Sequence, residues 1–195
     1  MTLNRSELKK EAKANLNGKF GSAIAVLFLI VLVLAVSGIT FIGPILLGGP
    51  LAIGGGIFFL KIAQKKDTSV RDAFEGFGQF GSGFVAYILQ AIFVILWSLL
   101  LIIPGIIAAL SYSQTYFILA ENKELGGLAA ISKSKELMKG HKGELFVLQL
   151  SFFWWYLLVI LTLGIALFYV GPYIASTLSA YYKKLTTGDS AVTAN

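Results

Sequence analysis

The chain has 195 residues, of which 56% are apolar and only 13% are charged, whereas an ordinary soluble domain is roughly 25% charged. This composition excludes a water-soluble globule, and the lack of cysteine excludes disulfides, thiolate chemistry and cysteine metal ligands. The formal net charge of +6 is modest, and membrane topology explains the basic residues better than nucleic acid binding does.

Three long tracts without a charged residue or histidine follow one another: residues 20–60, 76–120 and 145–182, which contain 41, 45 and 38 residues. About 20 helical residues are enough to cross a bilayer, so each tract is expected to cross it twice. The turns are expected near the middle of each tract, at Gly43-Pro44, Pro104-Gly105 and Gly164. The predicted fold class is all-α: a polytopic membrane protein with six transmembrane helices arranged as three hairpins.

The segments outside these tracts hold every basic residue. Segments 1–19, 61–75, 121–144 and 183–195 contain five, four, five and two Lys or Arg residues, which together are all 16. If every tract is a hairpin, these segments share one side of the membrane, and basic residues favour the cytoplasmic side. We therefore expect a multi-pass plasma-membrane protein with both termini cytoplasmic. Two alternatives are less favoured: an odd number of crossings in one tract, and a signal peptide cleaved after Ala35-Val36-Ser37.

Short amphipathic helices at the membrane surface are predicted within the charged segments. Asn4 with Glu7 has the spacing of a helix-capping pair, and so does Ser69 with Asp72. The helices that follow these caps, together with segment 125–139, have apolar sides made of Leu8, Ala12 and Leu16; of Val70, Phe74 and Phe77; and of Leu128, Ile131 and Met138. The last three are expected to face lipid.

A glycine motif returns along the chain. Gly18-Lys19-Phe20-Gly21-Ser22 recurs 60 residues later as Gly78-Gln79-Phe80-Gly81-Ser82, and more weakly as Gly140-His141-Lys142-Gly143. The recurrence suggests a three-fold parallel internal repeat with approximate units 1–60, 61–122 and 123–185. These units form a single integral membrane domain, residues 1–185, and residues 186–195 are expected to be a mobile polar tail. Chance similarity among glycine-rich segments is the alternative explanation.

Small residues recur at every fourth position in the second arm of each hairpin: Gly48, Ala52 and Gly56; Gly105, Ala109 and Ser113; and Gly171, Ala175 and Ser179. Such stripes let transmembrane helices pack closely. We expect the second arms inside the bundle, with the bulkier first arms around them. Replacement of Ala109 or Ala175 by Leu is accordingly expected to lower stability.

Uncharged polar residues gather in one second arm, at Ser111, Ser113, Gln114, Thr115 and Tyr116. If the protein encloses a cavity, these side chains are expected to line it. Hydrogen bonding between helices is the alternative role for polar residues in a membrane span.

Aromatic residues gather at two places in the third tract. Trp154, Trp155 and Tyr156 lie well inside its first arm and are expected near the middle of the membrane. Tyr181 and Tyr182 directly precede two lysines, which is typical of an aromatic anchor at the membrane interface.

The sequence shows no catalytic pattern. The three tracts lack the acidic, basic and histidine residues that mark proton relays and voltage sensors, and no nucleophile elbow, phosphate-binding loop or zinc motif is present. No catalytic, cofactor-binding or metal site and no cofactor is therefore predicted. A membrane enzyme would have only Asp72, Glu121 and Glu124 as candidate acids, and these are expected to be solvated, like the single histidine, His141.

Several motifs together resemble those of one bacterial membrane family. They are Glu7-Leu8-Lys9 with Ala12-Lys13, Leu16 and Gly18; Phe74 and Gly76-Phe77; Ile103-Pro104-Gly105-Ile106; Glu121-Asn122 with Glu124-Leu125; Ser134 with Leu137-Met138-Lys139-Gly140; Leu150-Ser151-Phe152 with Trp155; Leu161-Thr162-Leu163-Gly164-Ile165; and Pro172-Tyr173. Over nearly the whole chain, to about Leu185, this pattern resembles the bacterial integral-membrane family catalogued as domain of unknown function 975. That family often has proline where this chain has Lys123. The resemblance implies an integral membrane protein of bacteria, mostly Gram-positive ones, and implies no activity.

Two functions are compatible with these features, and neither is enzymatic. The first is a bacterial plasma-membrane protein that acts through contacts with membrane lipids or with another membrane protein, for example as an accessory to envelope transport or stress response. The alternative is a passive permease or channel for a neutral or amphipathic solute. No nucleic acid partner is expected.

Overall fold

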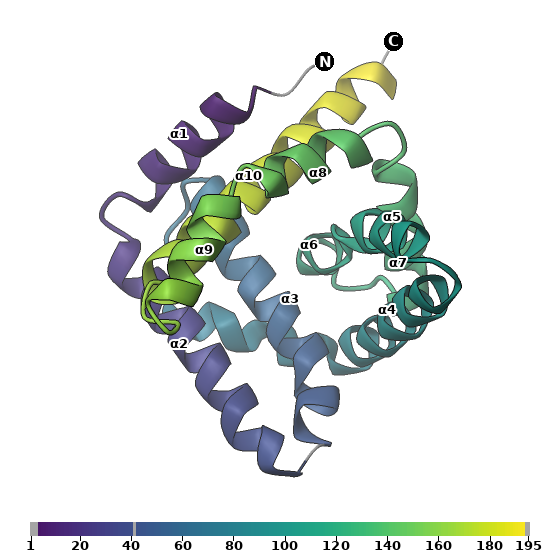
Figure 1. Ribbon diagram of the computed structural model, residues 1–195, viewed down its shortest axis with the longest axis horizontal. Helices are drawn as coiled ribbons and strands as arrows, with labels where there is room; N and C mark the ends of the chain where they lie inside the picture. Colours follow the sequence, from purple (N-terminus) through teal and green to yellow (C-terminus); the bar gives the residue numbers. More distant parts are fainter. Residues whose placement is uncertain (1–3, 41, 194–195) are drawn as a thin grey trace.

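Helices account for nearly all of the structure, a computed structural model that describes residues 4–40 and 42–193 (Figure 1). In chain order they are α1 (Arg5–Leu16), α2 (Phe20–Ser37), the 3-10 helix η1 (Gly38–Thr40), α3 (Gly43–Ala63), the 3-10 helix η2 (Val70–Gln79) and α4 (Phe80–Leu100). There follow α5 (Ile102–Tyr112), α6 (Thr115–Glu121), α7 (Gly127–Leu137), α8 (Lys142–Leu150), α9 (Phe153–Leu161) and α10 (Leu167–Thr193). The described residues contain no strand, so the all-α prediction is confirmed.

All three expected turns coincide with interruptions between helices. α2 and α3 are separated ahead of Pro44, which lies in the first turn of α3. Leu101, whose backbone is extended, separates α4 from α5, and Pro104 again lies in the first turn of the helix that follows. Between α9 and α10, Gly164 has a φ of +92°, a left-handed conformation that glycine adopts most readily.

Five helical segments are long and apolar enough to cross a membrane: Phe20–Ser37, Gly43–Ala63, Val70–Leu99, Ile102–Glu121 and Lys142–Leu161. They differ in how much of their apolar stretch the protein buries. The buried share is 67% for Gly43–Ala63 and 50% for Ile102–Glu121, against 11%, 11% and 17% for the other three. The segments formed by α3 and by α5 with α6 are therefore the more buried ones, as is expected of the second arms.

α3 lies in the middle of the fold, in contact with α2, η2, α4, α6 and α10 (Figure 1). Glycine makes the closest of these contacts possible. A Cβ on Gly54 would overlap the carbonyl oxygen of Ala73, and one on Gly49 would overlap that of Gly83. Lipid is as apolar as a leucine side chain, so close backbone approach of this kind becomes a main source of helix association in a membrane.

The capping box predicted at Ser69 is present. The Ser69 N–H donates to Asp72 Oδ2 over 2.9 Å, and the Arg71 N–H donates to Ser69 Oγ over 3.3 Å. It opens the 3-10 helix η2, which packs along α3 with Gly76 against the Pro50 carbonyl oxygen.

The side of η2 that is buried holds Ala73 and Gly76 rather than Phe74, which is 42% exposed. The predicted apolar side of α1, and most of that of α7, faces protein. Leu8, Ala12 and Leu16 of α1 are 1%, 0% and 3% exposed, and α1 packs along α10. Ile131 of α7 and Met138, which directly follows α7, are buried as well, so the expectation that they face lipid is wrong, and of the three residues only Leu128 is exposed. The 3.6-residue pattern identifies an apolar face, but lipid and protein cover such a face equally well.

α10 extends further than expected. Its helical backbone continues to Thr193 and so reaches well into the segment 186–195, which was expected to form a mobile tail. The last two residues of that segment lie outside the described residues.

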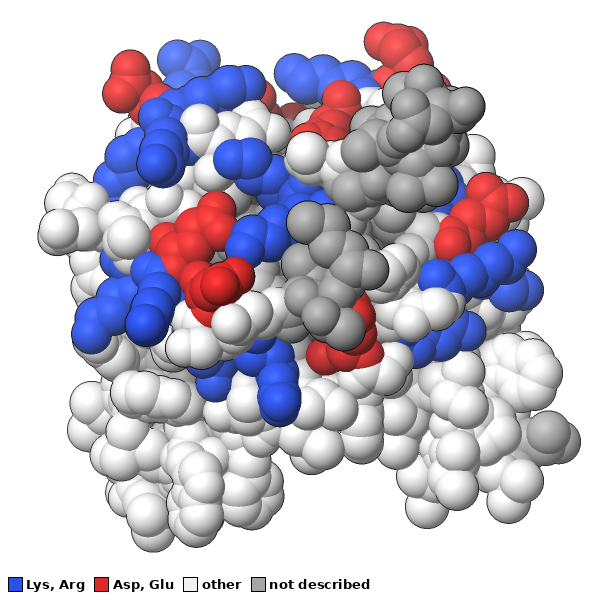
Figure 2. Space-filling model, turned by 90° about the horizontal axis from the view of Figure 1, so that it is seen from above, with Lys and Arg blue, Asp and Glu red and all other residues white. Residues whose placement is uncertain are grey.

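Charged side chains gather on one side of the surface. In the face shown by Figure 2, Lys, Arg, Asp and Glu occupy the upper part, whereas the lower part carries none and ends in two projections with a hollow between them. The side chains at the helix turns are apolar and strongly exposed, among them Ile39 (81%), Leu99 (78%) and Leu163 (95%). A membrane protein with all its charged segments on one side would have this distribution.

Candidate functional site

Asp72, one of the candidate catalytic acids, has a structural role where η2 packs against α3. Asp72 is 6% exposed and accepts hydrogen bonds from the Ser69 N–H and from Lys61 Nζ, both over 2.9 Å. Lys61 also donates to Glu75 over 3.0 Å. A buried carboxylate needs such partners, so Asp72 acts as a structural ion pair and cap. The expectation that it is a solvated surface acid is wrong.

Glu121 connects α6 to two other helices. Its carboxylate accepts hydrogen bonds from the Tyr182 hydroxyl over 2.8 Å and from Gln64 Nε2 over 3.3 Å. Tyr182 is 2% exposed and Tyr181 1%, and the Tyr181 hydroxyl donates to the His141 carbonyl over 3.2 Å. Both tyrosines thus belong to the protein core, and their expected role as an anchor at the membrane interface is wrong.

The polar residues predicted as cavity lining lie at a break between α5 and α6 that the sequence did not predict. Ser134 of α7 closes this break, because its hydroxyl donates to the Ser111 carbonyl over 2.8 Å and accepts from the Gln114 N–H over 3.2 Å. Ser134 is fully buried. Its hydroxyl therefore bonds to the Ser111 carbonyl and the Gln114 N–H, which would have no helical partner at the break.

The side chains of Ser113, Gln114 and Thr115 bond to one another or to nearby backbone. Gln114 Nε2 donates to Ser113 Oγ over 2.9 Å, and the Thr115 hydroxyl donates to the Tyr112 carbonyl over 2.8 Å. Neither they nor Ser111 and Tyr116 line the two cavities that the structure forms beside α1. Ser111, Ser113, Gln114 and Thr115 thus form a hydrogen-bonded joint between helices, in which Gln114 Oε1 has no partner among the described residues.

The stripes of small residues are only partly covered by other helices. Four members are buried, namely Gly48, Gly56, Gly105 and Ser179, and four are half-buried, namely Ala52, Ser113, Gly171 and Ala175. Ala109 is exposed and its neighbour Ala108 is buried. With 3.6 residues per turn, positions four apart drift around a helix by about 40° per step, so the stripe leaves the contact face. Leu at Ala109 is therefore expected to be tolerated, contrary to the expectation from sequence.

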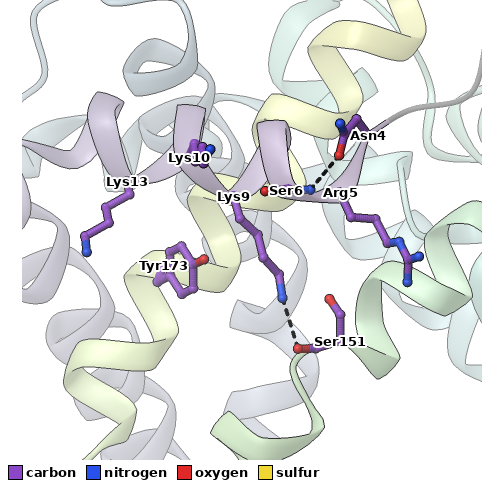
Figure 3. A pocket seen from close by; sticks show the side chains of 8 residues that line it. All are labelled: Asn4, Arg5, Ser6, Lys9, Lys10, Lys13, Ser151 and Tyr173. Atoms are coloured by element: carbon purple, nitrogen blue, oxygen red, sulfur yellow. Dashed lines mark hydrogen bonds between the residues drawn. The ribbon is translucent and has the colours of Figure 1, made fainter.

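A row of basic side chains on α1 borders the first cavity. Arg5, Lys9 and Lys13 stand four positions apart and so share one side of the helix. The cavity is open, has a volume of about 520 Å³, and is lined by these three residues with Asn4, Ser6, Lys10, Ser151 and Tyr173 (Figure 3). Lys9 spans it: its Nζ donates to the Ser151 carbonyl over 2.9 Å and lies 4.1 Å from the centroid of the Phe152 ring.

A second cavity, of about 640 Å³, continues from the first, because Lys10, Lys13 and Tyr173 line both. Its remaining walls include the apolar and aromatic residues Leu16, Phe20, Trp155 and Tyr169. The Trp155 ring centroid lies 6.1 Å from that of Tyr169 and 5.8 Å from that of Tyr173. We call the two cavities together the α1 groove, which is cationic at one end and aromatic at the other.

The charges of the α1 groove are not balanced by the protein. Among the described residues no carboxylate lines it, and the α1 acid Glu11 pairs instead with Lys184 of α10 at 3.4 Å. Arg5, Lys10 and Lys13 form no ion pair with any residue that the structure describes. Burial, with the charge of Arg5 as a second cause, lowers the pKa of Lys9. Cations gathered without a counter-charge favour an anionic ligand.

The residues of the α1 groove were not predicted from the sequence as a site. The basic residues of α1 served only to predict topology, although the four-residue spacing of Arg5, Lys9 and Lys13 could have indicated a cationic face. No local pattern connects that face with Ser151, which is 142 positions from Lys9.

Comparison with known proteins gives a family match over almost the whole chain. The family model described as "Protein of unknown function (DUF975)" matches residues 1–104 and 99–189. No curated protein and no solved structure matches the chain.

Proposed function

Because the chain belongs to the DUF975 family, whose function is unknown, we propose its role from its own structure: it is a bacterial plasma-membrane protein, not an enzyme, that acts through contacts with membrane lipid or a partner protein at its cytoplasmic face. The observation that carries this proposal is the α1 groove, where basic side chains without carboxylate partners adjoin aromatic residues of apolar helices. The acids Asp72 and Glu121 are engaged in contacts that hold helices together, which also supports a non-enzymatic role.

The proposed topology has six crossings in three hairpins, with both termini in the cytoplasm. Five crossings use the apolar segments that begin at Phe20, Gly43, Val70, Ile102 and Lys142. The sixth uses the first part of α10, residues 167–182, which has no charged residue. The gathering of charged side chains on one side in Figure 2 supports this topology, since the positive-inside rule then assigns that side to the cytoplasm.

A three-fold parallel repeat would account for the same arrangement. The residues directly before α2, α4 and α8 are Lys19, Gln79 and His141, each within a copy of the glycine motif. Their φ angles are −114°, −119° and −105°, and their ψ angles are 5°, 37° and −3°. A short helix precedes each copy, namely α1, η2 or α7. These similarities support a repeat of three structurally similar units.

Cysteine accessibility tests the topology, because the natural chain has no cysteine. Ile39→Cys, Ile103→Cys and Ile165→Cys, at exposed positions near the three turns, are expected to react with a membrane-impermeant maleimide in intact cells. Lys66→Cys and Lys133→Cys are expected to react only after the cells are permeabilised. If one of the first three cysteines does not react, the proposed hairpin at that turn is refuted. If either lysine position reacts in intact cells, the cytoplasmic location of that segment is refuted.

Photo-crosslinking in cells tests the contact function. A photoreactive amino acid at Asn17, which borders the α1 groove, is expected to capture lipid or one reproducible protein, whereas the same group at the exposed Lys133 of α7 captures neither. Equal yields at both positions would contradict the proposal. Solute flux into liposomes above that of empty vesicles, abolished by a bulky residue at Ser113 or Gln114, would establish a passive permease instead.

A further inference from the structure

We propose that the α1 groove binds an anionic phospholipid of the inner leaflet, with the headgroup phosphate at Lys10 and Lys13, which line both cavities, and an acyl chain along Trp155 and Tyr169. This inference rests on the proposed membrane-contact function and names the ligand of that site. It follows from three properties of the groove: its charge, its aromatic end and its place in the chain.

The cationic end suits a phosphodiester. Lys9 is already engaged by the Ser151 carbonyl, which leaves Lys10 and Lys13 as the cations that line both cavities and can meet an incoming anion. Arg and Lys are the side chains that bind phosphate most often, through hydrogen bonds strengthened by charge. Among the residues that the structure describes, none of those lining the groove has a carboxylate that would compete for these cations.

The aromatic end suits an acyl chain rather than a second charged group. The rings of Phe20 and Tyr169 contact each other in a tilted arrangement, with 5.1 Å between centroids, and Tyr169 is 48% exposed although its neighbours are apolar. A free phosphate or an acidic peptide would leave this aromatic surface in contact with water. An amphiphile covers both ends, because its phosphate meets the cations while its acyl chain covers the aromatic rings.

The place of the groove in the chain favours a lipid from the inner leaflet. α1 ends at Leu16 and α2, the first apolar segment, begins at Phe20, so the groove lies where a charged helix meets a membrane span. Trp155 and Tyr169 belong to the uncharged tract 145–182, so they lie on the apolar side of this boundary. A phospholipid at the bilayer surface has its phosphate and its first methylene groups on either side of this same boundary.

Tryptophan quenching in the full-length protein tests the proposal. The chain has three tryptophans, and Trp97→Phe with Trp154→Phe, at positions 47% and 74% exposed, leaves Trp155 as the reporter. In detergent micelles, phosphatidylglycerol brominated on its acyl chains is expected to quench Trp155 at about one tenth of the concentration that brominated phosphatidylcholine requires. Equal quenching by the two lipids would overturn the proposal, even if no further variant could be purified.

Matched charge variants then locate the headgroup. Lys10→Gln with Lys13→Gln is expected to weaken phosphatidylglycerol binding about 25-fold, since each basic residue near an anionic headgroup contributes roughly a factor of five. Lys133→Gln with Lys135→Gln removes the same charge from exposed positions on α7 and is expected to change binding less than about two-fold. Equal effects of the two pairs would show non-specific attraction and refute the site.

Competition separates the lipid from other anions. Short-chain phosphatidylglycerol is expected to relieve the quenching, whereas millimolar inorganic phosphate or an acidic peptide is not. Relief by phosphate or by the peptide would assign the groove to a free anion or to a protein segment and refute the lipid. If quenching shows no lipid preference while accessibility and crosslinking behave as expected, only the lipid assignment fails; if Ile39→Cys and its counterparts fail, the topology fails independently of the groove.

Discussion

Replacement of Gly127 by alanine tests how closely α7 packs against α4. A Cβ at this position would stand 2.5 Å from the Ser82 carbonyl oxygen and 2.7 Å from the Ala86 nitrogen. Carbon and oxygen atoms in ordinary contact are about 3.3 Å apart or more. Both obstacles are backbone atoms, which cannot rotate away as a side chain can, so α7 has to retreat from α4 by roughly 0.8 Å to restore that distance.

The retreat loosens a well-packed part of the core. Ala130, Ile131 and Met138, which follow Gly127 in the chain, are 0%, 4% and 0% exposed. Forcing a group into such a contact costs about 1–3 kcal/mol, and the higher helix propensity of alanine offsets at most about 1 kcal/mol. The expected net loss is about 1–2 kcal/mol, which lowers the Tm of a chain of this length by roughly 2–8 °C.

The assay is thermal unfolding of the purified protein in one detergent, followed by far-ultraviolet circular dichroism. Gly143→Ala is the matched control, because Gly143 also lies in the first turn of a helix but a Cβ there would meet nothing within 4 Å. The control is expected to unfold at or slightly above the Tm of the natural protein. If Gly127→Ala is as stable as Gly143→Ala, the close packing of α7 on α4 is refuted.

Three further predictions use the same assay. Ser134→Ala leaves two buried backbone groups without partners and is expected to cost about 1–3 kcal/mol, whereas the exposed Ser132→Ala is neutral; equal stability would contradict the joint between α5, α6 and α7. Ala175 is half-buried against the core of α2 and α3, so Ala175→Leu is expected to lower the Tm by overpacking. Ala109 is exposed, so Ala109→Leu is expected to leave the Tm unchanged. Equal losses of Tm would favour the packing stripe inferred from the sequence. Asp72→Asn removes the buried charge and one of the two oxygens that accept from Lys61 and from the Ser69 N–H, and is expected to cost about 2 kcal/mol, so an unchanged Tm would refute its structural role.

Features that depend on adjacent residues were predictable from the sequence. The interruptions beside Pro44, Pro104 and Gly164 were expected from local backbone chemistry. Proline has a fixed φ and no N–H to donate, and glycine adopts the left-handed conformation readily. The capping box at Ser69 was expected because its hydrogen bonds join residues within one turn.

The partner of each apolar face was not predictable. Ile131 and Met138 were assigned to lipid, and they are buried in protein. A bilayer is as apolar as a protein core, so hydrophobicity alone cannot separate the two environments. The break between α5 and α6 was missed for a related reason: Ser134, which supplies its hydrogen-bond partners, comes from another helix.

The sequence by itself determined that the chain is helical and that its charged segments alternate with long apolar tracts. It also determined that Arg5, Lys9 and Lys13 share one side of α1, because their spacing matches the helical repeat. Only the tertiary structure decided that this side meets Ser151 and Trp155. The burial of Leu8 against α10 sets the position of α1, and contacts between residues so far apart in the chain depend on packing rather than on any local pattern.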